Sequence, residues 1–474
     1  MGILHRMFTL GPLTLLRMYR LKPALIVLTG ALFLILFALY DGYPIVTNDT
    51  GTYLTSGFTL QPPDDRPLFY GVFVRLTSLG MSGWMPPLMQ CVTLSYLLVR
   101  FIRRGVPQIP ANHIAGLILL TSLGTLAGWY VGQLTPDIFV SIFILASVIL
   151  FLENGPVKNK VILWLVMFLS ALMHSSIFLM AALFCIGFFV VSLFFKPMRR
   201  YRNRLIPIGA VAFLAWLAIS SSLYFTGKGF TSSRATHVFL VAKLAENGVL
   251  KTYLDVACNK KNYRICAYKE KLPPAAWEFH WNTDSPVHLT GGWESNRAEY
   301  NEILKDIYTT PRYYKAIMFK AVESTFRQLV LLNIDGWYGL PWTVMDEGTA
   351  PYNAIRKYFP HELNEFRYSR QNTKTFNIAL LNNSYHFLFI VSSLLVLFFL
   401  NQSIRKEAII IYLIIFSFLF LNAFVTANLS SVNERLNSRA AWLVSFVNIY
   451  FVYKMIILRW GSQKRSSYVG ETTL

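Results

Sequence analysis

The chain has 474 residues, of which 54% are hydrophobic and only 14% are charged. An ordinary soluble domain has about 25% charged residues, so this composition argues against a soluble protein and against a disordered one. The 44 Lys and Arg residues outnumber the 24 Asp and Glu residues and give a net charge of +20. The basic residues form short clusters between apolar stretches, which indicates membrane topology and not nucleic-acid binding.

A transmembrane helix needs about 20 predominantly apolar residues. By this criterion the sequence predicts an all-α polytopic membrane protein with about 10 transmembrane helices. The boundary between the fifth and sixth helices depends on a turn at 173–176, and without that turn the count is nine. The predicted segments are 24–41, 84–101, 112–131, 136–152, 161–177, 178–196, 205–224, 379–400, 407–427 and 440–458.

The distribution of Lys and Arg predicts which side of the membrane each loop occupies. The short loops on one side are strongly basic, with clusters at 100–104, 158–160, 196–204 and 405–406. The short loops on the other side hold three arginines, Arg66, Arg435 and Arg439. Because basic loops are retained in the cytoplasm, we expect both termini there, in a multi-pass protein of a bacterial inner (plasma) membrane.

The predicted segments divide the chain into three parts. Residues 1–224 form an N-terminal transmembrane module of about seven helices, with a first outer loop at 42–83. Residues 379–474 form a C-terminal transmembrane module of about three helices and a cytoplasmic tail. Between them, residues 225–378 are the soluble-like region, which we predict to be a mostly helical extracytoplasmic (periplasmic or extracellular) insert.

Two features describe this insert further. Apolar spacing indicates helical structure at 238–254 and within 299–333. Cys258 and Cys266 lie close together in the insert, and we interpret them as a disulfide formed in an oxidising compartment. The alternatives are two unpaired thiols, or half of a metal site completed by nearby histidines, although no CxxC pattern supports zinc.

The first outer loop contains the strongest catalytic candidate. Asp49 lies in the sequence Asn48-Asp49-Thr50-Gly51-Thr52-Tyr53, where a glycine would let a ligand approach the backbone closely. We therefore interpret Asp49 as a catalytic carboxylate, with Tyr53 in a supporting position. The other acids of this region are interpreted as solvated loop carboxylates, namely Asp41, Asp64 and Asp65.

Two further outer turns carry candidates. Asp137 follows Pro136 at the start of a predicted helix, so it could cap that helix, belong to an active site, or do both. His174 lies at the turn between the fifth and sixth segments and is either functional or a hydrogen-bonded packing residue.

The last outer loop, about 428–439, contains Glu434, Arg435 and Arg439. Arginines at the mouth of a helix bundle are suited to bidentate binding of phosphate. They could equally be interfacial anchors, or Glu434 and Arg439 could form a salt bridge. The functional interpretation is favoured because the candidate acids, His174 and these arginines all map to one side of the membrane.

Two of these motifs resemble a known family. The sequence around Asp49, followed by Arg66-Pro67-Leu68-Phe69-Tyr70, and the sequence Leu134-Thr135-Pro136-Asp137 are similar to integral membrane glycosyltransferases of the GT-C fold. Examples are the aminoarabinose transferase of lipid A and the protein O-mannosyltransferases. The resemblance covers about 24–176.

The chain also departs from that family pattern. Asp49 stands alone where those enzymes usually have an acidic pair. The soluble-like insert lies between the seventh and eighth segments, whereas their large soluble domain commonly lies at the C-terminus. No WWDYG-like motif is present, so a resemblance to oligosaccharyltransferases is not supported.

The resemblance implies a transferase that moves a sugar from a polyprenyl-phosphate or pyrophosphate donor to an extracytoplasmic acceptor, in cell-envelope glycan biosynthesis. In this interpretation Asp49 is the general base, Asp137 and His174 support or orient the acceptor, and the arginines hold the donor phosphate. The donor-binding arginines are Arg66, Arg435 and Arg439, with Glu434 beside them.

The same interpretation sets the expected cofactors and partners. No cofactor is required, and a divalent metal is not indicated, although Asp49, Asp137 and His174 could supply ligands. The expected partners are the lipid-linked donor, a lipid, glycan or protein acceptor, and membrane lipids, but not nucleic acid. The alternatives are a transporter or flippase of a lipid-linked glycan, and a glycan polymerase or assembly subunit.

Overall fold

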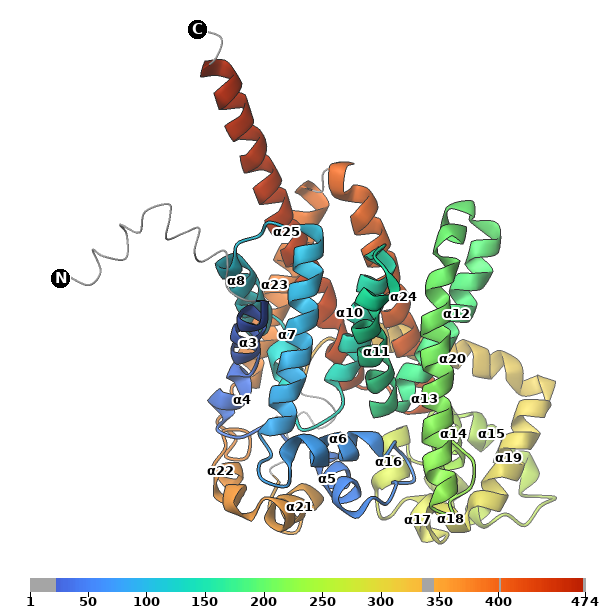
Figure 1. Cartoon of the computed structure of the whole chain (residues 1–474). Helices are drawn as coiled ribbons and strands as arrows, with labels where there is room; N and C mark the ends of the chain where they lie inside the picture. The colour runs from blue at the N-terminus through green and yellow to red at the C-terminus, as the bar shows by residue number, and fades with distance from the viewer. Residues whose placement is uncertain (1–22, 335–344, 400–401, 472–474) are drawn as a thin grey trace.

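The computed structural model describes residues 23–334, 345–399 and 402–471 (Figure 1). These residues form helices and contain no β-strand. The closest approach to a sheet is one isolated parallel bridge between Ile45 and Gln133. The predicted all-α class is therefore confirmed for the part of the chain that the structure describes.

Seven helices among the described residues are long and apolar enough to cross a membrane. This finding supports an integral membrane protein. The seven spans are Pro23–Asp41, which comprises α3 (Pro23–Leu34) and α4 (Leu36–Asp41); α7 (Met85–Gly105); α12 (Ser175–Phe194); Lys196–Phe225, which contains α13 (Leu205–Phe225); α23 (Ile378–Phe399); Ile404–Leu429 of α24 (Gln402–Leu429); and Glu434–Arg459 of α25 (Glu434–Glu471).

The other three predicted segments coincide with shorter helices, so the count of about ten stays a prediction. Segment 112–131 falls on α8 and α9, segment 136–152 on α10, and segment 161–177 on α11. The bounds of these helices are Ala111–Gly124 for α8, Ala127–Val131 for α9, Ile138–Leu152 for α10 and Val161–Met173 for α11.

Helix α10 lies at the centre of the bundle (Figure 1). All of its 15 residues are buried, and it packs against α7, α11, α24 and α25. A helix that is apolar on every side is expected to be buried in this way. At 1.5 Å per residue, its two ends lie about 22 Å apart. Asp137 precedes its first residue, so polar groups at its two ends are separated by an apolar layer.

The turn predicted at 173–176 is present. Helix α11 ends at Met173, and α12 begins at Ser175. Between them His174 has an extended backbone, with φ −146° and ψ 126°, and its imidazole accepts a hydrogen bond from the Ser176 backbone N–H. The break therefore comes from a local helix cap in an otherwise apolar stretch.

The first outer loop forms α5 (Thr50–Thr59) and α6 (Phe69–Ser78), and α5 is covered by α21 (Ala350–Tyr358), which is followed by α22 (Leu363–Arg367). Gly51 explains how closely α5 and α21 pack, because a Cβ atom at this position would lie 2.4 Å from the carbonyl carbon of Ala350. The predicted ligand approach at Gly51 is therefore wrong, since the glycine admits another segment of backbone.

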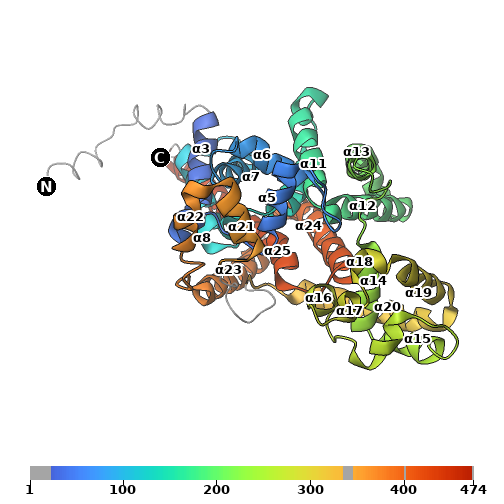
Figure 2. The same ribbon diagram turned by 90° about the horizontal axis from the view of Figure 1, so that it is seen from below.

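The larger part of the insert has its own apolar core, which includes Val238, Leu254, Phe279 and Ile303. It lies to one side of the transmembrane bundle (Figure 2). Residues 350–378, by contrast, pack with the bundle core. The helices of the larger part are α14 (Thr236–Glu246), α15 (Val249–Ala257), α16 (Ala276–Trp281), α17 (Pro286–Leu289), α18 (Gly292–Ser295), α19 (Arg297–Thr309) and α20 (Tyr314–Val330).

The two helical stretches predicted in the insert are each interrupted. The first is divided between α14 and α15 at Gly248, whose φ of 74° is left-handed and favours glycine. The second is divided between α19 and α20 by a short 3₁₀ turn that starts at Pro311. The 3₁₀ helices are η1 (Val157–Lys160), η2 (Lys196–Arg204), η3 (Arg264–Lys271), η4 (Pro311–Tyr313) and η6 (Pro360–Glu362).

The predicted disulfide is confirmed. Cys258 follows α15 and Cys266 lies in η3, and their Cα atoms are 5.8 Å apart. The two thiols within the bundle, Cys91 and Cys185, are free. The bond therefore closes a small loop at the edge of the insert core.

Candidate functional site

Two loops are joined beside the outer end of α10. The Ile45 backbone N–H donates to the Gly132 carbonyl at 3.0 Å, and the Leu134 N–H donates to the Ile45 carbonyl at 2.9 Å. The Thr50 hydroxyl adds a third bond, donated to the Leu134 carbonyl at 3.1 Å. These contacts fix the start of α5 against the start of α10, which brings Asp49 and Asp137 into one region.

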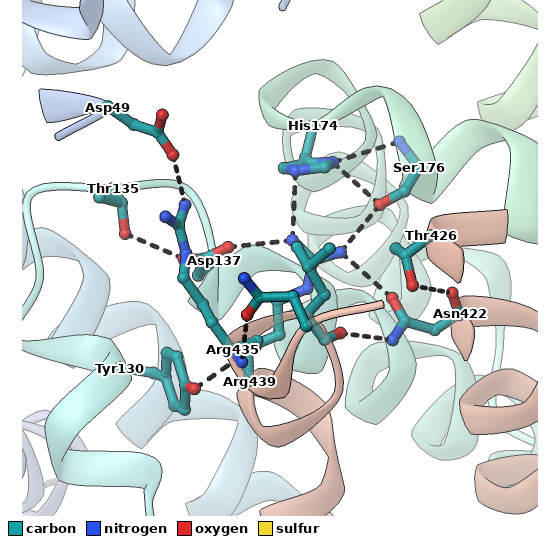
Figure 3. A network of polar contacts seen from close by, with 12 residues as sticks. Asp49, Tyr130, Thr135, Asp137, His174, Ser176, Asn422, Thr426, Arg435 and Arg439 are labelled. Atoms are coloured by element: carbon teal, nitrogen blue, oxygen red, sulfur yellow. Dashed lines mark hydrogen bonds and ion pairs between the residues drawn. The ribbon is translucent and has the colours of Figure 1, made fainter. Parts of the chain in front are cut away.

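Asp49 lies between two arginines that come from distant parts of the chain. Figure 3 shows its contact with one of them, Arg435. Its Oδ1 is 2.7 Å from Arg66 Nη1, and its Oδ2 is 2.7 Å from Arg435 Nη2. Asp49 is the N-cap residue of α5, but its side chain makes no capping hydrogen bond. Its carboxylate is therefore used for these ion pairs.

Asp137 forms a second pair of contacts behind the first. Its Oδ2 is 2.6 Å from Arg435 Nε, and its Oδ1 is 2.9 Å from Arg439 Nη1. Both Asp137 and Arg439 are fully buried. Asp137 occupies the N-cap of α10, as the capping alternative expects, but its side chain makes no capping hydrogen bond and is used for these ion pairs. Arg435 thus bridges both acids and is not an interfacial anchor.

His174 and Arg439 form the inner end of the network (Figure 3). Arg439 Nη1 lies 3.1 Å from His174 Nε2. Arg439 Nη2 also donates to Ser176 Oγ and to Asn422 Oδ1, both at 3.2 Å. Burial, followed by the Arg439 charge, lowers the pKa of His174 to about 3, so the imidazole is neutral at ordinary pH.

Charge balance sets the protonation of Asp49. Burial acts to raise the pKa of this carboxyl, but the guanidinium groups of Arg66 and Arg435 outweigh it and hold the pKa well below its usual range. The same pairing with Asp49 helps to raise the pKa of Arg66 against the opposing effect of burial. Asp49 is therefore a firmly ionised carboxylate in this geometry.

Arg66 also contacts two further residues of the first outer loop. It pairs with Asp65 at 2.5 Å, and its guanidinium carbon lies 5.2 Å from the centre of the Tyr53 ring. Asp65 has a side-chain exposure of only 10%, so its interpretation as a solvated loop carboxylate is wrong. The Tyr53 ring is buried and lies against the Arg66 guanidinium, a contact that suits the supporting position predicted for Tyr53.

The other two acids of the first loop serve the fold. Asp41 is buried and accepts a hydrogen bond from the Gln371 backbone N–H at 2.6 Å, so it is not a solvated carboxylate either. Asp64 is half-exposed and pairs with Lys228 at 2.8 Å, which ties the first loop to the start of the insert.

A cavity of about 690 Å³ opens beside this network. Asp49, Arg66, His174 and Arg435 line its polar part. The buried residues Asp137 and Arg439 are not among the lining residues, and neither is Glu434, which accepts a hydrogen bond from Asn333 at 3.1 Å. The apolar part of the wall is formed by Phe178, Leu179, Val425, Leu429 and Leu436, and the insert adds Phe239, Leu240, His280 and Trp281.

Ser176, Asn422 and the wall residues from the insert were not predicted from the sequence. Ser176 lies in the turn predicted at 173–176. Asn422 is a polar side chain inside a predicted membrane segment, and such a residue signals a buried functional or structural contact. Trp281 carries no such signal, because the sequence does not show which face of the insert meets the bundle.

The geometry does not favour the metal site that the sequence allowed. Among the described residues, no group of three His, Cys, Asp or Glu side chains could hold a metal ion. The two candidate acids are each paired with guanidinium groups, and His174 faces Arg439.

Comparisons with known protein families, curated proteins and solved structures find no match. The function therefore has to be argued from this site.

Proposed function

We propose that this protein is a membrane glycosyltransferase that moves a sugar from a polyprenyl-phosphate donor to an extracytoplasmic acceptor. The observation that supports this proposal is one cavity with an ionised carboxylate and two guanidinium groups at one part of its wall and aliphatic and aromatic side chains at another. A ligand with a charged phosphate and an apolar chain is the chemistry that matches both parts.

The arginines are suited to the phosphate of such a donor. A planar guanidinium can make two parallel hydrogen bonds to phosphate oxygens, and Arg66 and Arg435 both reach the cavity. Phe178, Leu179 and Leu429 lie on helices α12 and α24, which are long enough to cross a membrane. The polyprenyl chain would lie along these side chains.

Donor binding would change the state of Asp49. Its carboxylate pairs with both Arg66 and Arg435, and a carboxylate with so low a pKa is a weak base. A donor phosphate competes for the same guanidinium groups. Once it has displaced the carboxylate, the pKa of Asp49 rises toward its ordinary value, and the base becomes active only when the donor is present.

The reaction then has a balanced course. The acceptor hydroxyl gives its proton to Asp49 as its oxygen forms a bond to the anomeric carbon of the sugar. The bond between that carbon and the phosphate oxygen breaks, and its electron pair leaves with the polyprenyl phosphate. Arg66 and Arg435 stabilise the charge on this leaving group.

The buried residues have positioning roles in this proposal. Asp137 holds Arg435 through Nε and Arg439 through Nη1, so it fixes the guanidinium that meets the donor. Arg439 in turn orients His174 at the cavity wall. The direct phosphate contact suggested for Arg439 is replaced by this role, because Arg439 is fully buried and does not line the cavity.

The membrane arrangement belongs to the same proposal. We place about ten transmembrane helices in a GT-C-like arrangement, with both termini in the cytoplasm and the insert outside. The site would then face away from nucleotide sugars, which is why the donor would be lipid-linked. A transporter is less well supported, because the charged network is gathered at one end of α10 and not along a central path.

The test compares envelope glycans and glycolipids of a deletion strain with those of its parent. We expect the deletion to remove one sugar modification, and the wild-type chain to restore it. The Asp49→Asn chain, expressed to the same level in the membrane, should not restore it. An unchanged glycan profile in the deletion strain, or full restoration by the variant, would contradict the proposal.

A further inference from the structure

A second polar cavity lies at the opposite end of the bundle from Asp49. Its volume is about 570 Å³, and four cationic side chains line it together with one acid. The cationic residues are Arg104, Arg200, Arg204 and Lys454, and the acid is Glu407. They come from α7, η2, α25 and α24, so the cavity is built by elements from both halves of the chain.

The arginines of this cavity are held in place without being neutralised. Arg104 Nε donates to the Leu152 carbonyl at 2.9 Å, and Arg204 Nη1 donates to the Leu150 carbonyl at 3.2 Å. These carbonyls belong to the last turn of α10, where helical hydrogen bonding ends and cations are favoured. The guanidinium groups are thereby fixed at the cavity wall.

The charge of the cavity is not balanced by the protein. Lys454 pairs with Glu407 at 2.5 Å, but none of the three arginines forms an ion pair within the described ranges. Arg200 instead lies over the ring of Tyr201, 4.7 Å from its centre. A guanidinium has five N–H donors, so bonds to one or two acceptors leave most of them available to a ligand.

A buried hydroxyl group lies behind one of the lining residues, Gly105. Tyr450 is almost fully buried, and its Oη has no hydrogen-bond partner among the described residues. The hydroxyl rests against Gly105, which lines the cavity, because a Cβ atom there would lie 1.6 Å from it. An unpaired buried polar group of this kind is costly, and here it lies next to the lining of the cavity.

We propose that this cavity binds the phosphate of an anionic lipid headgroup. Three unpaired guanidinium groups provide the charge and the bidentate geometry for phosphate. The cavity lies about 22 Å along α10 from Asp137, at the other polar boundary of the apolar layer. Basic pockets between membrane helices are a known form of headgroup site. Exposed apolar side chains next to η2, Phe194 and Ile206, are available to the acyl chains.

The test is a titration of the purified full-length protein in nonionic detergent. Thermal unfolding is followed with short-chain phosphatidylglycerol, short-chain phosphatidylcholine or inorganic phosphate. We expect the anionic lipid to stabilise the protein at a concentration at least about tenfold lower than either of the other two. The Arg104→Gln/Arg204→Gln variant should raise the apparent Kd for that lipid by about tenfold or more.

Two further variants make the result specific. Arg103→Gln/Lys158→Gln removes the same charge from the same end of the bundle but outside the cavity, and it should leave the Kd unchanged. If the first variant does not fold, Arg200→Gln is used, because Arg200 is exposed and should be tolerated. Equal binding of the two lipids, or equal effects of cavity and control variants, would overturn the proposal. Inorganic phosphate binding as tightly as the anionic lipid would overturn the assignment to a lipid.

Discussion

At the scale of single residues, the site is defined by the competition for Arg66 and Arg435. Each guanidinium group lies 2.7 Å from Asp49 and also pairs with a second acid, Arg66 with Asp65 and Arg435 with Asp137. The pairing lowers the basicity of Asp49 and occupies N–H donors that a phosphate would use. Such an arrangement would suppress activity without a donor, since the base is released only when a competing anion arrives.

Replacing the base should remove transfer but not folding. Asp49→Asn keeps the shape of the side chain and removes its ability to accept a proton. We expect sugar transfer to fall about 10²–10⁴-fold, the usual scale of general-base catalysis. The rate is measured with purified protein in nanodiscs. Asp64→Asn is the matched control, because Asp64 lies in the same loop, pairs with Lys228 and does not line the cavity. Near-normal transfer by Asp49→Asn would contradict the role of Asp49 as the general base.

Arg435 should not tolerate replacement by lysine. Its Nε and Nη2 contact two different acids, and a single ammonium cannot reproduce that geometry. We expect Arg435→Lys to raise the donor KM by about tenfold or more, because a charge-assisted hydrogen bond is worth about 1.5–3 kcal/mol. Arg75→Lys is the control, as Arg75 lies in α6 and is not part of the cavity wall. An unchanged donor KM would place the phosphate elsewhere.

At the scale of elements, the position of Asp49 depends on the contact between α5 and α21. Gly51 permits this contact, so Gly51→Val should force the two helices apart. We expect a loss of stability of about 1–3 kcal/mol together with weaker transfer. Gly116→Ala is the control, because a Cβ atom at Gly116 meets nothing within 4 Å. Thermal unfolding compares the two variants. Equal melting temperatures would contradict a stabilising role for the contact between α5 and α21.

The disulfide should stabilise the insert locally. Cys258 and Cys266 are eight positions apart, and closing a loop of this size contributes on the order of 2–3 kcal/mol. We expect Cys258→Ser/Cys266→Ser to lower the melting temperature, while Cys185→Ser in the bundle should have less effect. Reductant should lower the melting temperature of the wild type and leave the double variant unchanged. A wild type insensitive to reductant would contradict this expectation.

Much of the element order could be predicted because apolar length is a local property. The segments on α10 and α11 and the turn at His174 follow from that property alone. The interruptions at Gly248 and Pro311 are also local, but apolar spacing continues across them and does not reveal them. The packing of α21 on α5 joins distant parts of the chain and leaves no local pattern.

The site was predictable to the level of which residues share a face, but not to the level of what each contacts. Asp49 and Arg435 are 386 positions apart, and only the folded chain shows that they are paired. Burial separates Arg435, which reaches the cavity, from Arg439, which does not, although both lie at the start of one helix. The side of α25 that faces the cavity is set by tertiary packing.

At the scale of the whole molecule, two separate groups of ion pairs lie at opposite ends of α10. Arg100 pairs with Glu153 at 2.7 Å beyond the C-terminus of α10, whereas Arg435 pairs with Asp137 at its N-terminus. The basic loops predicted to share one side of the membrane therefore meet at one end of the structure. This arrangement fits basic loops that share one side, and the assignment of that side to the cytoplasm stays a prediction.

The orientation can be tested by labelling single cysteines in intact cells, in a chain that carries Cys91→Ala and Cys185→Ala. We expect Thr283→Cys in the insert to react with a membrane-impermeant reagent. Asn203→Cys in η2 should react only after permeabilisation. Both positions are exposed, so access to the reagent depends on the side of the membrane. Labelling of the second position alone would reverse the topology and place the site in the cytoplasm.

The most direct measurement is the affinity of the purified protein for polyprenyl phosphate, with and without the Asp49 carboxylate. If the donor phosphate competes with Asp49 for Arg66 and Arg435, removing the carboxylate removes that competitor, while Arg66 keeps its pair with Asp65 and Arg435 keeps its pair with Asp137. We therefore expect Asp49→Asn to bind polyprenyl phosphate about tenfold more tightly than the wild type, although it cannot transfer sugar. Unchanged or weaker binding by Asp49→Asn would contradict the proposed exchange of the carboxylate for the donor phosphate.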